Sequence, residues 1–258
     1  MIGGGKMAEA LLGGLIESGW AQPDELHVVE PFEPRRVDLA ASMPGVSISD
    51  APRPNADAVI AVKPDVVPAV LGGLADAGVR RVLSIAAGVR AAAIEAGLVD
   101  GASVVRCMPN TPALVGRGAA AIAGGVNASA ADLEWASGIL SAVGIVVTVD
   151  EAEIDAVTGL SGSGPAYVFH LAEALIAAGI AEGLAPETAD ALARQTLLGA
   201  ATLLAESGED PAVLRTNVTS KGGTTAAGLA VFAEADFVGL VADVVKAATD
   251  RSRELGGA

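Results

Sequence analysis

The sequence predicts an α/β domain with a mostly parallel sheet, followed by an all-α domain. Up to about residue 150, short β-rich runs alternate with helical stretches, which is the pattern of βαβ units. From Glu151 onward no convincing strand pattern is found, and long Ala/Leu-rich periodic segments take its place. The 258 residues are enough for two domains. We therefore expect one domain over residues 1–150 and a second over residues 151–258.

The elements follow from β-branched runs, amphipathic spacing and local punctuation. In the first domain, strands are expected at residues 26–30, 58–62, 81–86, 103–108 and 145–149, and helices at 6–18 and 130–142. In the second, helices are expected at 164–182, 186–206, 211–219, 225–234 and 236–255. Pro186 and Pro211 mark helix starts, and Gly183 and Gly208 mark helix ends.

Composition excludes several classes of protein. The chain has 16 Lys and Arg against 31 Asp and Glu, a net charge of −15, which argues against a nucleic-acid partner. Two His and one Cys are too few for a His-rich zinc site or a disulfide framework, so no metal is expected, and a lone Cys suits a reducing compartment. The apolar run from Glu134 to Asp150 is too short to cross a bilayer, and no basic-then-apolar leader precedes it. We expect a cytoplasmic protein without a membrane partner.

The helices of the second domain are apolar for so short a region. Residues 151–258 are rich in Ala and would form a thin core on their own. Helices of this kind usually bury their remaining face against a partner. We expect a homodimer formed through these residues, and sedimentation showing a stable, active monomer would contradict it.

A glycine cluster opens the chain. Residues 2–8 read Ile-Gly-Gly-Gly-Lys-Met-Ala and fit G-x-G-x-x-A before an amphipathic helix. Small residues let the backbone approach a pyrophosphate, and the helix N-terminus supplies amide donors. Glu30 stands 22 residues beyond Ala8, about where an acid that binds the ribose belongs. A tight turn alone would explain the glycines, but the following strand and acid favour a Rossmann-type dinucleotide site.

The start of the chain departs from that pattern. Only Met1 and Ile2 precede Gly3, whereas a Rossmann first strand has about five residues. We hypothesise that the natural chain begins upstream or has been cut. The intact mass of the protein from its own source decides this, because a mass that matches Met1 as the first residue ends the hypothesis.

The identity of the dinucleotide stays open on these residues. Glu30 would accept from a ribose 2′-OH and favour NAD, whereas Arg35 and Arg36 could pair with a 2′-phosphate and favour NADP. A solvated helix face explains two Arg equally well. Two strand ends, Ala61-Val62-Lys63-Pro64 and Ile85-Ala86-Ala87-Gly88, are expected in the same crevice, because ligands bind at the carboxyl ends of such strands. Ordinary connecting loops are the alternative.

Five motifs together resemble pyrroline-5-carboxylate reductase in order and spacing over essentially the whole chain. They are Gly3-x-Gly5-x-x-Ala8, Ala61-Val62-Lys63-Pro64, Arg106-Cys107-Met108-Pro109-Asn110-Thr111-Pro112, the run from Asp155 to Tyr167, and Gly222-Gly223-Thr224-Thr225. The resemblance implies reduction of 1-pyrroline-5-carboxylate to L-proline with NADP as the cofactor, or NAD in its place. It also implies a Rossmann domain and a helical domain that interleaves with its twin in a homodimer, with rings up to a decamer of dimers.

The same resemblance implies the site residues. The cofactor would contact Ile2, Gly3, Gly4, Gly5, Lys6, Met7, Arg35, Ala61, Val62, Lys63, Pro64, Ala86, Ala87 and Asn217. The substrate would contact Glu151, Ser161, Ser163, Gly164, Gly223, Thr224 and Thr225. Two positions depart from the family, because Lys221 replaces a common Pro and Gly208 stands near where some relatives place an acid.

The chemistry needs a carboxylate clamp and a proton. Backbone N–H groups in a nest or at a helix N-terminus hold a carboxylate well, and the segments 161–165 and 222–225 have that form. Each segment could also be an ordinary N-capped helix start, but the resemblance favours a substrate-binding role for both. Thr225 is the expected catalytic residue, with Ser163 second, although an imine that arrives protonated needs no acid. Glu151 is better explained as an acid at a helix N-terminus.

The remaining singletons favour structural roles. Cys107 is expected to be a small buried hydrophobe, His27 to be structural, and His170 to be packed or exposed on its helix.

Two other functions stay open. A β-hydroxyacid dehydrogenase or imine reductase shares this architecture, but the ketone-reducing members rely on a helix Lys, and the helical section offers only Lys221 and Lys246. Higher activity on a hydroxyacid would establish that alternative. A non-catalytic NAD(P)-sensing protein would bind the dinucleotide tightly without turnover, yet it would have no use for two anion-binding segments.

Overall fold

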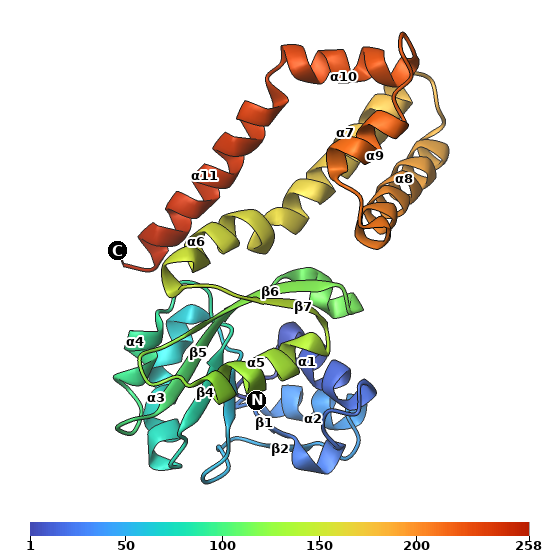
Figure 1. Cartoon of the computed structure of the whole chain (residues 1–258). Coiled ribbons are helices and arrows are strands. Elements are labelled where there is room, and N and C mark those ends of the chain that lie inside the picture. The colour runs from blue at the N-terminus through green and yellow to red at the C-terminus, as the bar shows by residue number, and fades with distance from the viewer. Residues whose placement is uncertain (258) are drawn as a thin grey trace. The chain divides into compact units, whose positions relative to one another are not determined.

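The computed structural model describes residues 1–257 as two compact units (Figure 1). The first unit contains residues 1–165 and the C-terminal stretch from Lys246, and the second contains Ala166–Val245. The α/β section followed by helices, predicted from the sequence, is confirmed.

The first unit is built on one twisted sheet. In the order of their pairing, its strands are β2 (Ser47–Ser49), β1 (His27–Val29), β3 (Ala58–Ile60), β4 (Arg81–Ser84), β5 (Ser103–Met108), β6 (Gly118–Gly124) and β7 (Gly144–Thr148), with Ile2 bridging β1 and β3. All pairs are parallel except β5 with β6, which confirms the mostly parallel sheet.

Met1 to Gly3 take the place of the short first strand between β1 and β3. Ile2 donates its N–H to Val59 at 2.8 Å, and its carbonyl accepts from Ala61 at 2.8 Å. Gly3 donates to Val29 at 2.8 Å, so three residues tie both neighbouring strands together. The glycine loop therefore starts directly at the carboxyl edge of the sheet.

Helices cover both faces of the sheet (Figure 1). On one face, α3 (Val67–Asp76) and α4 (Ala91–Glu95) pack Leu71 and Ile94 against Ile60. On the other, α1 (Lys6–Glu17) and α5 (Ala130–Ser141) pack with Val59, which points the opposite way because side chains alternate along a strand. A smaller cluster joins α2 (Glu33–Ser42) to α1 and β1.

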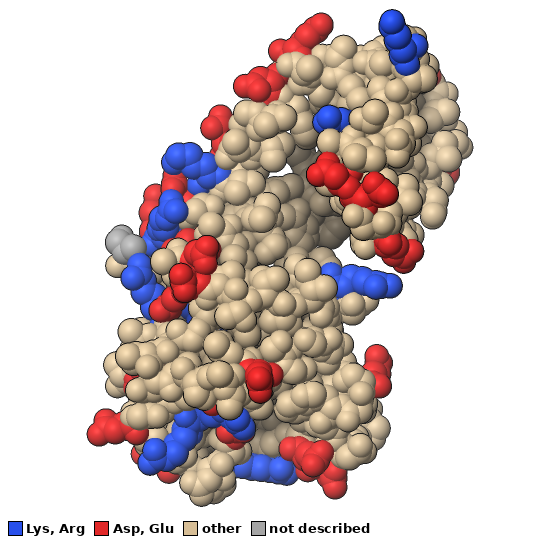
Figure 2. All heavy atoms as spheres, viewed as in Figure 1, with Lys and Arg blue, Asp and Glu red and all other residues tan. Residues whose placement is uncertain are grey.

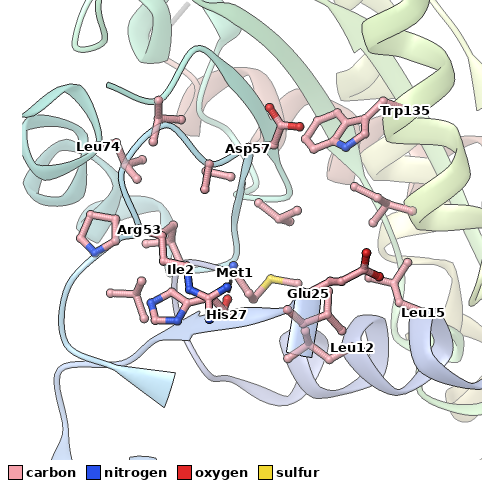
Figure 3. A pocket seen from close by; sticks show the side chains of 18 of the residues that line it. Met1, Ile2, Leu12, Leu15, Glu25, His27, Arg53, Asp57, Leu74 and Trp135 are labelled. Atoms are coloured by element: carbon pink, nitrogen blue, oxygen red, sulfur yellow. Dashed lines mark hydrogen bonds between the residues drawn. The ribbon is translucent and has the colours of Figure 1, made fainter. Parts of the chain in front are cut away.

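A cavity of about 270 Å³ lies beside Met1, at the amino ends of β1 and β3 (Figure 3). The side chains of His27 and Arg53 lie next to Met1, and Leu12, Leu74 and Trp135 contribute apolar walls. Burial lowers the pKa of the Met1 ammonium to about 5. Ligands of such sheets bind at the carboxyl ends of the strands, so this cavity is on the wrong edge for a dinucleotide.

The helices from residue 151 onward begin and end at the predicted proline and glycine residues. Two short turns, Glu151–Glu153 and α6 (Ile154–Val157), are followed by a π-helical turn, Thr158–Gly162, and by the long helices α7 (Gly164–Ala181), α8 (Pro186–Ser207), α9 (Pro211–Asn217), α10 (Thr224–Glu234) and α11 (Phe237–Leu255). Both prolines open their helices. Gly183 and Gly208 follow α7 and α8 with φ of 97° and 67°, which only glycine adopts cheaply.

The second unit buries very little of itself. Among residues 166–245, only Ala189 and Ala193 are buried. Large apolar side chains are exposed instead, such as Phe169 at 63% and Leu198 at 61%, and the face in Figure 2 shows broad uncharged areas on these helices. By length and composition alone, the stretch Glu151–Ala181 is long and apolar enough to cross a membrane. Core helices of soluble proteins meet the same criterion. The single chain leaves an apolar surface that needs a cover.

Candidate active site

The glycine loop has the shape of a phosphate cradle. Gly3 has a φ of 97°, and a Cβ there would lie 2.8 Å from the Ala61 carbonyl oxygen, so a larger residue does not fit. Gly5 caps α1 without a side-chain hydrogen bond, and no atom lies within 4 Å of the point where its Cβ would be. The first turn of α1 therefore has no side-chain cap, and its amides together with the positive end of the helix suit a pyrophosphate.

The other residues of this loop have different surroundings. Ile2 is buried in the sheet, Lys6 forms an exposed pair with Glu9 at 3.1 Å, and Met7 packs on the apolar cluster below α1. Only Lys6 among these three offers a charge to an anion.

An acid and a guanidinium group, those of Glu30 and Arg35, contact the glycine loop. Glu30 accepts from the Gly4 N–H through Oε2 at 3.0 Å and from the Phe32 N–H through Oε1 at 3.0 Å. Arg35 donates through Nε to the Gly4 carbonyl at 2.8 Å and pairs with Glu9 at 2.8 Å. These bonds hold the loop and the first turn of α2 in one arrangement.

The two predicted strand-end segments lie at the same edge of the sheet. Ala61, Val62, Lys63 and Pro64 follow β3, and Ala86 and Ala87 follow β4. Because β3 and β4 are parallel neighbours, their following loops emerge together beside the glycine loop. The sequence prediction that one crevice gathers these segments agrees with this topology.

A crevice of about 550 Å³ connects these loops to the helical segment within the first unit. Its lining is formed by Pro64, Asp65, Ala87, Gly88, Val89, Thr158, Ser163, Ala248, Arg251, Ser252 and Leu255. Two strand-end loops therefore meet the Thr158–Ser163 turn, part of which was predicted to bind the substrate. Across residues 1–257, no cluster of three metal-ligating side chains is found.

The expected helix start at residues 161–165 is found at Gly164, where α7 begins. The residues before it are not an open loop, because Thr158–Gly162 forms a π-helical turn that leads into α7. The Ser163 N–H donates to the Thr158 carbonyl at 2.9 Å and the Ser161 hydroxyl donates to Val157 at 3.2 Å, so neither is a spare donor in this arrangement. Ser163 itself lines the crevice. Single π-turns frequently occur at functional sites.

The Met108–Asn110 segment supports this π-turn, a role that sequence reasoning missed. Asn110 donates through Nδ2 to the Ser161 carbonyl at 3.0 Å and accepts from the Ala119 N–H at 2.8 Å. Met108 approaches so closely that a Cβ on Gly162 would lie 2.4 Å from its Cε. The order of motifs along the chain could have suggested a contact, but not which atoms make it.

Glu151 has internal partners. Its Oε1 accepts from the Ala91 N–H, at the start of α4, at 2.8 Å and lies 3.5 Å from Nη1 of Arg106. The Arg106 side chain is only 5% exposed, so Glu151 balances a buried cation. This arrangement agrees with a structural role near a helix N-terminus.

The C-terminal helix contributes residues that the sequence pattern did not single out. Ser252 is buried and donates to Oδ1 of Asp155 at 2.6 Å, which fastens α11 to α6 within the first unit. Arg251 lines the crevice and pairs with Glu254 at 2.7 Å. A regular amphipathic helix carries no sequence signal for such a role.

The remaining predicted site residues belong to the second unit. Gly223 is the N-cap of α10, without a side-chain cap, and Gly222 before it has a φ of 72°. Thr224 and Thr225 are exposed in the first turn of α10, and Asn217 is exposed at the end of α9. The expected helix start at residues 222–225 is confirmed as a local structure.

The lone cysteine and the two histidines have the surroundings expected for structural residues. Cys107 is buried on β5, and burial raises the pKa of its thiol far above the usual range. His27 lies 3.0 Å from the Ser47 hydroxyl, and His170 is exposed beside Glu173.

Fold and site together define a Rossmann-type oxidoreductase with a helical second region. Residues 151–255 match the family described as "Pyrroline-5-carboxylate reductase dimerisation", and residues 1–88 match "NADP oxidoreductase coenzyme F420-dependent". The pyrroline-5-carboxylate reductase of Synechocystis is 45% identical over 99% of this chain and 97% of its own length. The chain belongs to the pyrroline-5-carboxylate reductase family.

Solved structures agree with this assignment. A pyrroline-5-carboxylate reductase from Coxiella burnetii superposes with a TM-score of 0.92 at 37% identity, covering 98% of this chain and 96% of that one. The Plasmodium falciparum pyrroline carboxylate reductase with NADP bound has a TM-score of 0.82 at 29% identity, covering 99% and 96%. The homodimer and NAD(P) use predicted from the sequence are supported by these matches.

Proposed function

We propose that this protein reduces 1-pyrroline-5-carboxylate to L-proline with NAD(P)H. The observation that carries the proposal is the crevice in which Pro64 and Ala87, from the strand-end loops, meet Thr158 and Ser163. Loops at the carboxyl ends of parallel strands suit a dinucleotide, and the side-chain hydroxyls of Thr158 and Ser163 suit a small polar substrate. Residues 1–150 would form the cofactor domain and residues 151–258 the substrate and dimerisation domain.

The residues fit a dinucleotide. The uncapped first turn of α1 would hold the pyrophosphate, with Gly3, Gly4 and Gly5 letting the backbone approach it closely and the exposed Lys6 adding a positive charge. The rest of the proposed cofactor site is formed by Ile2, Met7, Arg35, Ala61, Val62, Lys63, Pro64, Ala86, Ala87 and Asn217. The bound nicotinamide supplies the hydride, so the protein needs to bind, orient and polarise.

The substrate carboxylate would be held at the N-terminus of α10. Gly223 leaves the first amides of α10 without a side-chain cap, and Thr224 and Thr225 add hydroxyls there. Ser161, Ser163 and Gly164 would complete the substrate site, with Ser163 as the group that lines the crevice. Glu151 would act as a positioning residue, because its carboxylate is bonded to Ala91 and Arg106.

Thr225 is the residue proposed to assist proton delivery to the substrate nitrogen. Its hydroxyl would donate a hydrogen bond to the pyrroline nitrogen and relay a proton from water as the ring carbon accepts the hydride. Proton delivery needs no strong acid if the imine arrives protonated. This accounts for a site with few titratable side chains.

Assembly and location complete the proposal. The exposed apolar helices would be covered in a homodimer, with larger assembly up to a decamer of dimers, and the enzyme would act in the cytoplasm without a membrane or nucleic-acid partner. Light scattering of the purified protein measures the assembly directly.

The experiment that tests the function follows NADPH or NADH oxidation on adding pyrroline-5-carboxylate and identifies proline as the product. Proline formation that depends on enzyme, dinucleotide and imine supports the proposal. Dinucleotide binding without turnover of any imine contradicts it.

A further inference from the structure

We propose that Ser252 and Asp155 form a positioning pair for the reaction, which holds the end of α11 as a wall of the crevice. The inference rests on the proposed function and names a bond that sets the geometry of that site. Four residues of α11 line the crevice, namely Ala248, Arg251, Ser252 and Leu255. Their spacing of three and four residues places them on one face of the helix. The last turns of α11 are therefore part of the site.

A short side-chain bond joins this wall to α6. The Ser252 hydroxyl donates to Oδ1 of Asp155 at 2.6 Å, between residues 97 positions apart in the sequence. Ser252 is only 5% exposed, and a hydroxyl that donates to a carboxylate away from water forms a strong, charge-assisted bond. Removing the carboxylate would leave a buried hydroxyl without its acceptor, so this bond fixes where α11 lies against α6.

Backbone hydrogen bonds continue from this pair to the substrate side of the crevice. The Asp155 carbonyl accepts from the Thr158 N–H, and the Thr158 carbonyl accepts from the Ser163 N–H at 2.9 Å. Thr158 and Ser163 both line the crevice. A shift of Asp155 would therefore also shift the two residues whose hydroxyls are proposed to meet the substrate.

The same serine is connected to the dinucleotide side. The Ser252 carbonyl accepts from the Gly256 N–H at 3.0 Å. A Cβ on Gly88 would lie 3.7 Å from the Leu255 carbonyl carbon and 3.8 Å from the Gly256 nitrogen, so the end of α11 lies against that loop. Gly88 follows β4 and lines the crevice beside the segment proposed to bind the dinucleotide. Ser252 thus links both sides of the crevice.

Hydride transfer depends on the distance between those two sides. A displacement of about 1 Å can lower a rate about 100-fold, even when its origin lies away from the reacting atoms. Neither Ser252 nor Asp155 has to touch a reacting atom for this effect. The glycine loop, which is proposed to hold the dinucleotide, does not take part in the bond between them. Loss of the pair should therefore lower kcat and leave dinucleotide affinity unchanged.

The test measures turnover and dinucleotide binding in variants of the full chain. In Ser252→Ala and Asp155→Ala we expect kcat with pyrroline-5-carboxylate to fall at least about tenfold, while the dissociation constant of NAD(P)H stays within about twofold. The double variant should lose no more than the worse single variant, because both changes break one bond. Ser252→Cys keeps the size of the side chain but weakens the donor, so it should fold and still lower kcat.

Hydrogen exchange gives a second measurement that needs no turnover. In Ser252→Ala, amide exchange should become faster in the turn Thr158–Gly162 and in residues 85–89 as well as in α11, because the connected hydrogen bonds loosen. Arg253→Ala is the matched control, since it removes an exposed side-chain bond to Asp250 on the same helix. Thermal unfolding verifies that each variant is folded.

Each result decides the inference. A lower unfolding temperature with unchanged kcat in Ser252→Ala and Ser252→Cys would show a structural role alone and overturn it. It is also overturned if the two single losses multiply in the double variant, or if Arg253→Ala loses as much. If the unmodified chain turns over no imine, the proposed function fails. Exchange then decides the pair by itself, because faster exchange on both sides of the crevice supports it and a change confined to α11 contradicts it.

Discussion

Thr225 lies exposed in the first turn of α10, one residue from the uncapped helix start. We expect Thr225→Ala to lower kcat by more than about tenfold, because the hydrogen bond to the imine nitrogen is lost, while dinucleotide affinity stays unchanged. Stopped-flow or steady-state assays and a binding titration measure the two quantities. Thr188→Ala, in the exposed first turn of α8, is the matched control. Unchanged turnover in Thr225→Ala would remove this residue from the mechanism.

Cys107 contrasts with the exposed Thr225. Its thiol is a reactive group, but it is buried in the protein. Burial raises the pKa of its thiol, and the neutral thiol is a poor nucleophile. We expect a thiol reagent to label the native protein slower than the denatured protein by roughly two orders of magnitude. Cys107→Ala should keep its turnover. Rapid labelling of the native chain with loss of activity would contradict this assignment.

At the scale of elements, the contact of Glu151 with α4 and β5 is the one that a single change can test. Glu151→Ala leaves the Ala91 N–H and the buried Arg106 guanidinium without their carboxylate, so we expect a loss of about 2 kcal/mol in the free energy of unfolding. Urea denaturation measures it, and Glu134→Ala on the exposed side of α5 is the control. A positioning role predicts that kcat falls more than KM changes. A large rise in KM at unchanged stability would instead show direct substrate contact.

Most helices and strands could be predicted from local pattern, and the exceptions have a physical cause. The apolar run 103–108 is β5 as predicted, because a central strand is buried on both faces. β6 was not predicted, since Gly118–Gly124 is mostly Ala and owes its strand form to pairing with β5 and β7. β2 is too short and polar to be recognised, as Ser47–Ser49 contains one apolar residue.

The candidate site also has parts that the sequence pattern predicts and parts that depend on tertiary contacts. The glycine loop and the strand ends follow from spacing along the chain, because the backbone itself forms the cradle. The π-turn could not be predicted, since Ser-Gly-Ser-Gly-Pro suggests only a helix start, and the helical form of the residues just before it is supported by contacts with Met108 and Asn110. Arg251 and Ser252 enter the site only through tertiary packing of α11.

The whole molecule depends on a second copy, because the second unit buries so few of its own side chains. Phe169 on α7 is 63% exposed in the single chain and we expect it to be buried in the dimer. Phe169→Glu should shift sedimentation towards the monomer and lower activity at least about tenfold, because a buried unpaired charge opposes association. Val37→Glu on α2, at 64% exposure, is the matched control. A Phe169→Glu protein that remains a fully active dimer would place the interface elsewhere.

Hydride transfer to a cyclic imine can be followed atom by atom with a labelled dinucleotide. Pyrroline-5-carboxylate is incubated with the enzyme and NAD(P)H deuterated at the transferable ring position, and the proline formed is examined by mass spectrometry and NMR. We predict one deuterium per proline, on the ring carbon that was double-bonded to nitrogen. Proline without deuterium, or no proline at all, would show that the enzyme does not carry out this transfer.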